Sequence, residues 1–68
     1  MMGKAFKFMR EDAGMTQAEL AEKSGVSLRQ IQAFEMGYRD INKANVLTVL
    51  RLSEALECDV YDIINPRG

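Results

Sequence analysis

The sequence predicts an all-α fold, a compact domain built from five short helical segments. Apolar residues recur at steps of three and four along most of the chain, which is the spacing of one face of a helix. Gly14, Gly25 and Gly37 each follow such a stretch, where a left-handed residue commonly ends a helix. The single proline, Pro66, comes after all five segments and interrupts none of them. No alternation of apolar and polar residues predicts a strand.

The first three helices are expected at about residues 4–13, 16–23 and 27–36. Thr16 followed by Glu19 has the spacing of a capping box, in which each side chain satisfies a backbone N–H of the first turn. The residues expected on the inward faces of these helices are Met2, Phe6, Met9, Ala13, Leu20, Ala21, Ile31 and Phe34.

The last two helices are expected at about residues 43–57 and 59–64. Asn42 is expected to cap the longer helix and Asp59 the shorter one, because their side chains accept hydrogen bonds from free backbone N–H groups. The wide inward stripe expected on the longer helix consists of Val46, Val49, Leu50, Leu52, Ser53 and Leu56.

The composition bounds the class of protein. A chain of 68 residues predicts a single domain, with a core at about 4–64 and a tail at 65–68. Histidine is absent and Cys58 is the only cysteine, which excludes a disulfide framework, a Cys/His zinc site and a nucleophile–histidine pair. The carboxylates are at caps or on polar helix faces, and no motif pairs an acid with a base or forms a phosphate-binding glycine loop, so we expect no enzyme activity, no metal and no cofactor. A single domain also predicts no small-molecule ligand.

The cellular location is predicted from three features. The sequence has no apolar run near the roughly 20 residues that a membrane helix needs. Its beginning lacks the apolar stretch and cleavage site of a secretory signal peptide. A lone cysteine is typical of a reducing compartment. The expected location is the cytoplasm, with no membrane as a partner.

The most informative stretch is residues 17–34, where two capped helices are joined by a tight turn. Ala21 is small, so the two helices can approach closely, and Gly25 accepts the positive φ that the turn requires. Ile31 and Phe34 hold the second helix against the first and against the core. This is the pattern of a helix-turn-helix, whose second helix enters the major groove of DNA.

At these residues the chain resembles the Cro/phage-repressor class of helix-turn-helix proteins, the XRE family. The matching positions are residues 15–27, Ile31 and 34–37, and the resemblance extends over about 4–64. It implies a five-helix domain with the helix-turn-helix at helices two and three. It also implies a sequence-specific double-stranded-DNA-binding transcriptional regulator, a repressor, that reads the major groove with residues 27–36.

The outward face of the third helix carries the residues that the family uses to read bases, here Leu28, Arg29, Gln32 and Ala33. Arg29 can donate two hydrogen bonds to guanine, and Gln32 can pair with adenine. Leu28 and Ala33 can offer only apolar contact, for instance to a thymine methyl group. The alternative interpretation is an ordinary solvated helix surface.

Other residues are assigned to the DNA backbone or to the fold. By resemblance Gln17 donates to a phosphate. Arg39 and Lys43 belong to the connector that follows the third helix, residues 37–43, and their charges suit the next phosphates. Ser27 is expected to cap the third helix and touch a phosphate. The resemblance further implies a buried ion pair between two residues, Arg10 and Glu35.

The expected partners are a pseudo-palindromic operator and a second copy of the chain, at least on DNA. Apolar residues that could form the contact between copies are Phe8, Tyr38, Ile41, Leu47, Tyr61 and Ile64. The formal net charge of −1 predicts weak non-specific binding with a shallow salt dependence. The alternative function is an antitoxin-like or other protein-interaction module that retains the helix-turn-helix fold.

Overall fold

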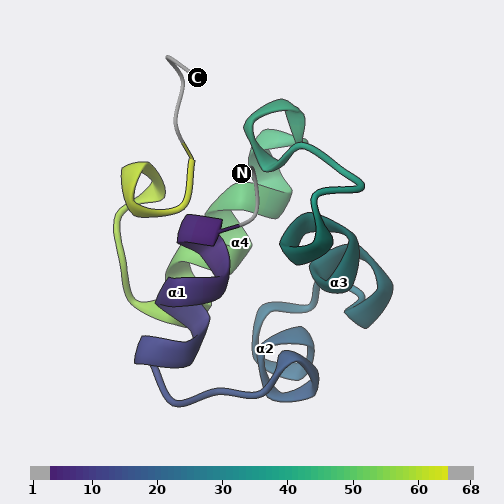
Figure 1. Cartoon of the computed structure of the whole chain (residues 1–68). Helices are drawn as coiled ribbons and strands as arrows, with labels where there is room; N and C mark the ends of the chain where they lie inside the picture. Colours follow the sequence, from purple (N-terminus) through teal and green to yellow (C-terminus); the bar gives the residue numbers. More distant parts are fainter. Residues whose placement is uncertain (1–3, 65–68) are drawn as a thin grey trace.

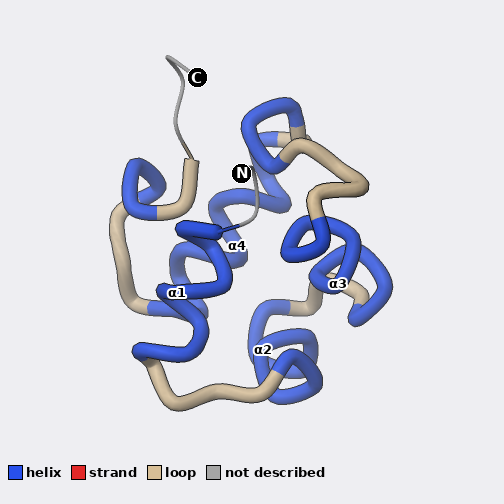
Figure 2. Tube along the Cα trace, in the orientation of Figure 1, coloured by secondary structure: helices blue, strands red, loops and turns tan. Residues whose placement is uncertain are grey.

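The computed structural model describes residues 4–64 and places them in short helices joined by turns (Figure 1). It has four α-helices and two short 3-10 helices, which are α1 (Lys4–Asp12), α2 (Gln17–Ser24), α3 (Leu28–Met36), η1 (Ile41–Lys43), α4 (Val46–Leu56) and η2 (Val60–Asp62). Residues 4–64 contain no strand (Figure 2). The all-α prediction is confirmed, whereas Met2 and the tail at 65–68 lie outside the described residues.

The fifth segment does not form the α-helix expected at residues 59–64. It forms only η2, one turn of 3-10 helix, in which the Asp59 side chain accepts a hydrogen bond from the Tyr61 N–H. Ile63 directly after the turn is buried in the core. The predicted cap at Asp59 is confirmed, and between it and the buried Ile63 there is room for a single turn. The predicted count of five helices is not confirmed.

The ends of α2 and α3 follow the local sequence rules. The Glu19 N–H donates to the Thr16 hydroxyl (3.1 Å), and the Glu19 carboxylate accepts from the Thr16 N–H (2.8 Å). Gly25 and Gly37 end the two helices with φ values of 76° and 79°. These left-handed conformations favour glycine because it has no Cβ. The predicted capping box and both glycine stops are confirmed.

The start of α4 differs from the prediction. The helix begins at Val46 and is capped by Asn45, whose side chain accepts a hydrogen bond from the Leu47 N–H (2.8 Å). The predicted cap at Asn42 is wrong, because residues 41–43 form η1 and bury Ile41 in the core. Two residues of the expected inward stripe are consequently exposed, Val46 at 72% and Leu50 at 44%.

The helices enclose one apolar core. α2 packs against α3 and α4, while α1 packs against α3 and η2. The rings of Phe6 and Phe34 meet edge to face, with centroids 6.2 Å apart. The buried apolar residues are Phe6, Leu20, Val26, Ile31, Phe34, Ile41, Val49, Leu52, Ala55, Leu56 and Ile63. Of the remaining inward predictions for the first helix, Met9 is half-buried, and Ala13, which follows the end of α1, is exposed.

Within residues 4–64, every helix is too short or too polar to cross a membrane.

Candidate nucleic-acid interface

The helix-turn-helix is formed by α2, a three-residue turn and α3. Val26 in the turn is buried, and its N–H donates to the Ser24 hydroxyl (3.1 Å). Ile31 and Phe34 on α3 are almost fully buried. Because a helix with one face fixed in the core can expose only the other, these two residues determine which side chains of α3 reach solvent.

The predicted base-reading residues lie on that outer face. Leu28, Arg29 and Gln32 are exposed, and Ala33 is half-buried. Ser27 caps α3 by accepting a hydrogen bond from the Gln30 N–H (3.2 Å). No hydrogen bond or ion pair between described residues engages the side chains of Arg29 and Gln32. Both side chains are therefore available to a partner.

These side chains border an open hollow of about 410 Å³ between the start of α2 and the outer face of α3. Its lining consists of Gln17, Arg29, Gln32, Ala33, Met36 and Tyr38. Four of these residues are sequence-predicted site residues, which the fold brings together. Met36 was missed, although it follows Gln32 by four positions and such residues neighbour each other on a helix. Tyr38 was expected at the contact between copies and not beside the base-reading residues.

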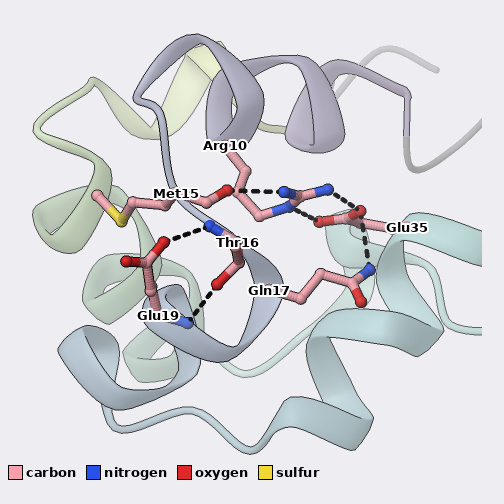
Figure 3. A network of polar contacts seen from close by, with 6 residues as sticks. All are labelled: Arg10, Met15, Thr16, Gln17, Glu19 and Glu35. Atoms are coloured by element: carbon pink, nitrogen blue, oxygen red, sulfur yellow. Dashed lines mark hydrogen bonds and ion pairs between the residues drawn. The ribbon is translucent and has the colours of Figure 1, made fainter.

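A network of polar contacts around Arg10 adjoins Gln17, one of the residues that line the hollow (Figure 3). The Arg10 Nε donates to Glu35 Oε2 (2.6 Å) and its Nη2 to Glu35 Oε1 (2.9 Å). Its Nη1 donates to the Met15 carbonyl oxygen (2.7 Å). The hydrogen bond with Glu35 raises the pKa of the Arg10 guanidinium above its ordinary value, against the opposing effect of burial. The structure therefore contains the ion pair that the family resemblance implied.

Gln17 connects this network to the hollow. Its Nε2 donates to Glu35 Oε1 (3.1 Å), a contact that the sequence analysis did not predict (Figure 3). Since a side-chain amide carries two N–H groups, one remains for another acceptor. The contact orients the Gln17 side chain at the first turn of α2, where free backbone N–H groups also favour an anion.

The two basic residues of the connector lie outside the lining of the hollow. Arg39 is exposed, and its guanidinium lies 5.8 Å from the centroid of the Phe34 ring. Lys43 is exposed at the end of η1. Asp40 between them caps η1 by accepting a hydrogen bond from the Asn42 N–H (2.9 Å). The connector thus presents two cations beside the helix-turn-helix.

In the part of the chain that the structure describes, no cluster of three or more histidine, cysteine, aspartate or glutamate residues could hold a metal ion.

Comparisons with known proteins agree with this geometry. A family model described as Helix-turn-helix matches residues 6–63. The chain is also similar to an uncharacterized HTH-type transcriptional regulator, y4dJ, of Sinorhizobium fredii. The two are 29% identical over 66 residues, which cover 97% of this chain and 82% of the relative. No solved structure matches the chain significantly.

Proposed function

This chain belongs to the Cro/C1-type helix-turn-helix family, and from that premise we propose that it is a sequence-specific regulator of transcription which binds double-stranded DNA. The observation that carries the proposal is the outer face of α3. Arg29 and Gln32 are exposed on this face, and their side chains make no hydrogen bond or ion pair with other residues among 4–64. The opposite face of the helix carries the buried Ile31 and Phe34. A helix in this position fits the major groove, which is wide enough to admit it.

We assign base reading to the N-terminal half of α3. Arg29 donates a bidentate pair to guanine O6 and N7, and Gln32 pairs with adenine N6 and N7. Leu28 and Ala33 make apolar contacts with thymine methyl groups. Each bidentate pair discriminates against a wrong base by about 1–3 kcal/mol, so these two pairs account for most of the expected sequence preference.

Contacts to phosphates position the protein without reading sequence. We assign them to Gln17 and Ser27 at the starts of α2 and α3, and to Arg39 and Lys43 in the connector. Two cations in this set release few counterions, in line with the net charge of −1. Affinity is therefore expected to fall only gently as salt is raised.

A second copy of the chain is the proposed partner on a pseudo-palindromic operator, with half-sites about 10–10.5 base pairs apart. The first two turns of α4 expose Val46, Leu47 and Leu50, which together form an apolar patch. Ile41 was expected at this contact but is buried in the core. The patch is small against the roughly 800 Å² per partner of a stable interface, so the dimer is expected to form on DNA.

We further propose that the regulator acts as a repressor in the cytoplasm. Repression requires only that the protein occupies its site, whereas activation also requires a surface that recruits the transcription machinery. The free thiol of Cys58 suits a reducing compartment.

The proposal is tested by selecting bound sequences from a random pool of duplexes. The unchanged protein is expected to enrich one sequence, and Arg29→Ala and Gln32→Ala are expected to relax different positions of it. Arg51→Ala is the matched control, because this arginine is exposed on α4 outside the hollow. Enrichment that survives both α3 substitutions unchanged would refute the assignment of base reading.

The second candidate function is a protein-interaction module of the antitoxin type, favoured by the same apolar patch on α4. The two functions differ in what the patch binds. If the patch joins two copies, Leu47→Glu is expected to weaken operator binding by removing the cooperativity between the copies. In an interaction module it would instead abolish binding of a different protein, and the random pool would yield no enriched sequence.

A further inference from the structure

Two large apolar side chains stand exposed at the end of α3. Met36, the last residue of the helix, is 62% exposed, and Tyr38 is 80% exposed. Both line the hollow that also contains Arg29 and Gln32. An exposed apolar side chain gains free energy when a partner removes it from water, so this pair favours a partner with apolar surface.

The backbone holds Tyr38 firmly while leaving its side chain free. Gly37 turns the chain with a φ of 79°, and the Tyr38 N–H then donates to the Ala33 carbonyl oxygen (2.9 Å). The Arg39 N–H donates to the same oxygen (3.2 Å). The tyrosine ring is therefore carried on a fixed turn, which limits the conformational entropy that binding has to remove.

The position of this pair on the helix determines which part of the DNA it can meet. In a helix-turn-helix the N-terminal residues of the second helix contact the base edges. Met36 and Tyr38 lie at the opposite end of α3. In a complex docked in this way, that end is farther from the base edges and nearer the sugar–phosphate backbone at the edge of the groove. Deoxyribose presents C–H surface there, which suits a thioether and an aromatic ring, and the tyrosine hydroxyl can donate to a phosphate.

We propose that Met36 and Tyr38 form an uncharged anchor that packs against the deoxyribose groups at the edge of the major groove. The inference rests on the proposed function and adds a specific contact to it. The anchor stabilises the complex without recognising sequence and without releasing counterions. A chain with a net charge of −1 obtains little affinity from neutralising phosphates, and the anchor adds affinity by a different route.

The test compares dissociation constants on two duplexes of equal length, the sequence enriched from the random pool and a scrambled one, between about 50 and 200 mM salt. Tyr38→Ala is expected to weaken binding to both duplexes by about tenfold, which is about 1.4 kcal/mol, with an unchanged salt slope. Met36→Ala is expected to act in the same way but less strongly. Tyr38→Phe retains most of the affinity, because the ring provides the contact.

Arg51→Ala serves again as the control, since this arginine is exposed on α4 and does not line the hollow. It is expected to leave both affinities unchanged. Thermal unfolding of each variant, followed by circular dichroism, verifies that the fold is intact. Tyr38 is exposed and is not one of the residues packed in or against the core. The melting temperature of Tyr38→Ala is therefore expected to stay near that of the unchanged protein.

Three results would overturn the anchor. Unchanged affinity in Tyr38→Ala, while Arg29→Ala loses binding, would refute it and leave the proposed function standing. A loss confined to the enriched duplex would make Tyr38 a base reader, and a reduced salt slope would make its contribution ionic. If the unchanged protein enriches no sequence, the proposed function itself fails, which is a distinguishable outcome.

Discussion

Replacing Glu35 with alanine is expected to remove a large part of the folding stability of this domain. The substitution takes away two of the three acceptors of the Arg10 guanidinium and the acceptor of the Gln17 amide. Arg10 then keeps only the Met15 carbonyl oxygen as a partner. A charge left without its counter-ion in a buried position typically costs about 3–5 kcal/mol.

The burial of the pair supports the upper part of that range. The side chains of Arg10 and Glu35 are only 11% and 3% exposed, so water screens their interaction weakly. A domain of this size has a free energy of unfolding of about 3–10 kcal/mol. A loss of about 4 kcal/mol would therefore remove a large part of this free energy and lower the melting temperature by about 15–30 °C.

Urea denaturation followed by circular dichroism measures the loss as a change in the free energy of unfolding. Glu54→Ala is the control, because this glutamate is exposed on α4. Arg10→Met is expected to cost several kcal/mol as well, while Arg10→Met combined with Glu35→Met recovers most of the stability because no charge is left unpaired. A loss below about 1 kcal/mol in both single variants would refute the reasoning.

Three further predictions concern the fold. Glu57 ends α4 with a φ of 54°, a conformation that favours glycine. Glu57→Gly is therefore expected to raise the free energy of unfolding by about 0.5–1 kcal/mol, whereas Glu57→Ala is not expected to raise it. Equal effects of the two substitutions would exclude backbone strain as the cause. Burial, and then the nearby carboxylates of Asp62 and Asp59, raise the pKa of the Cys58 thiol above its ordinary value of 9.0. The unfolded chain therefore releases this proton first, and the thiol's stabilising contribution is complete below about pH 9 and is lost as the pH rises through the folded pKa. Urea titrations should show the advantage of the unchanged protein over Cys58→Ser shrinking above pH 9, and a constant difference would contradict this sign. Thr16→Ala is expected to cost about 1 kcal/mol through loss of the α2 cap, Thr16→Ser much less, and identical melting temperatures for all three proteins would count against the cap.

The features predicted correctly from the sequence depend on residues close together in the chain. The Thr16–Glu19 capping box and the glycine stops at Gly25 and Gly37 are determined within a few residues. The exposure of Arg29 and Gln32 follows from the helical period once the inward residues of α3 are identified. Such local rules gave the positions of α2 and α3, and with them most of the candidate site.

The features that were missed depend on distant contacts. Asn42 and Asn45 are the same residue type, so the sequence alone makes them equally good caps. The burial of Ile41 places residues 41–43 in η1, and α4 is therefore capped by Asn45. Gln17 and Glu35 are 18 positions apart, so their hydrogen bond appears only when α2 and α3 are packed. Tyr38 lies beyond the helical period of α3, and the Gly37 turn alone brings it to the hollow.

The Arg10 network also separates two tasks that a DNA-reading surface would otherwise combine. The Arg10 guanidinium links the end of α1 to Met15, which precedes α2, and to Glu35 on α3. It thereby helps to fix the angle between α2 and α3. Leu28, Arg29 and Gln32 take no part in that brace. An engineer, or natural selection, could therefore exchange these three outward residues to retarget the protein to a different operator while its melting behaviour stays the same.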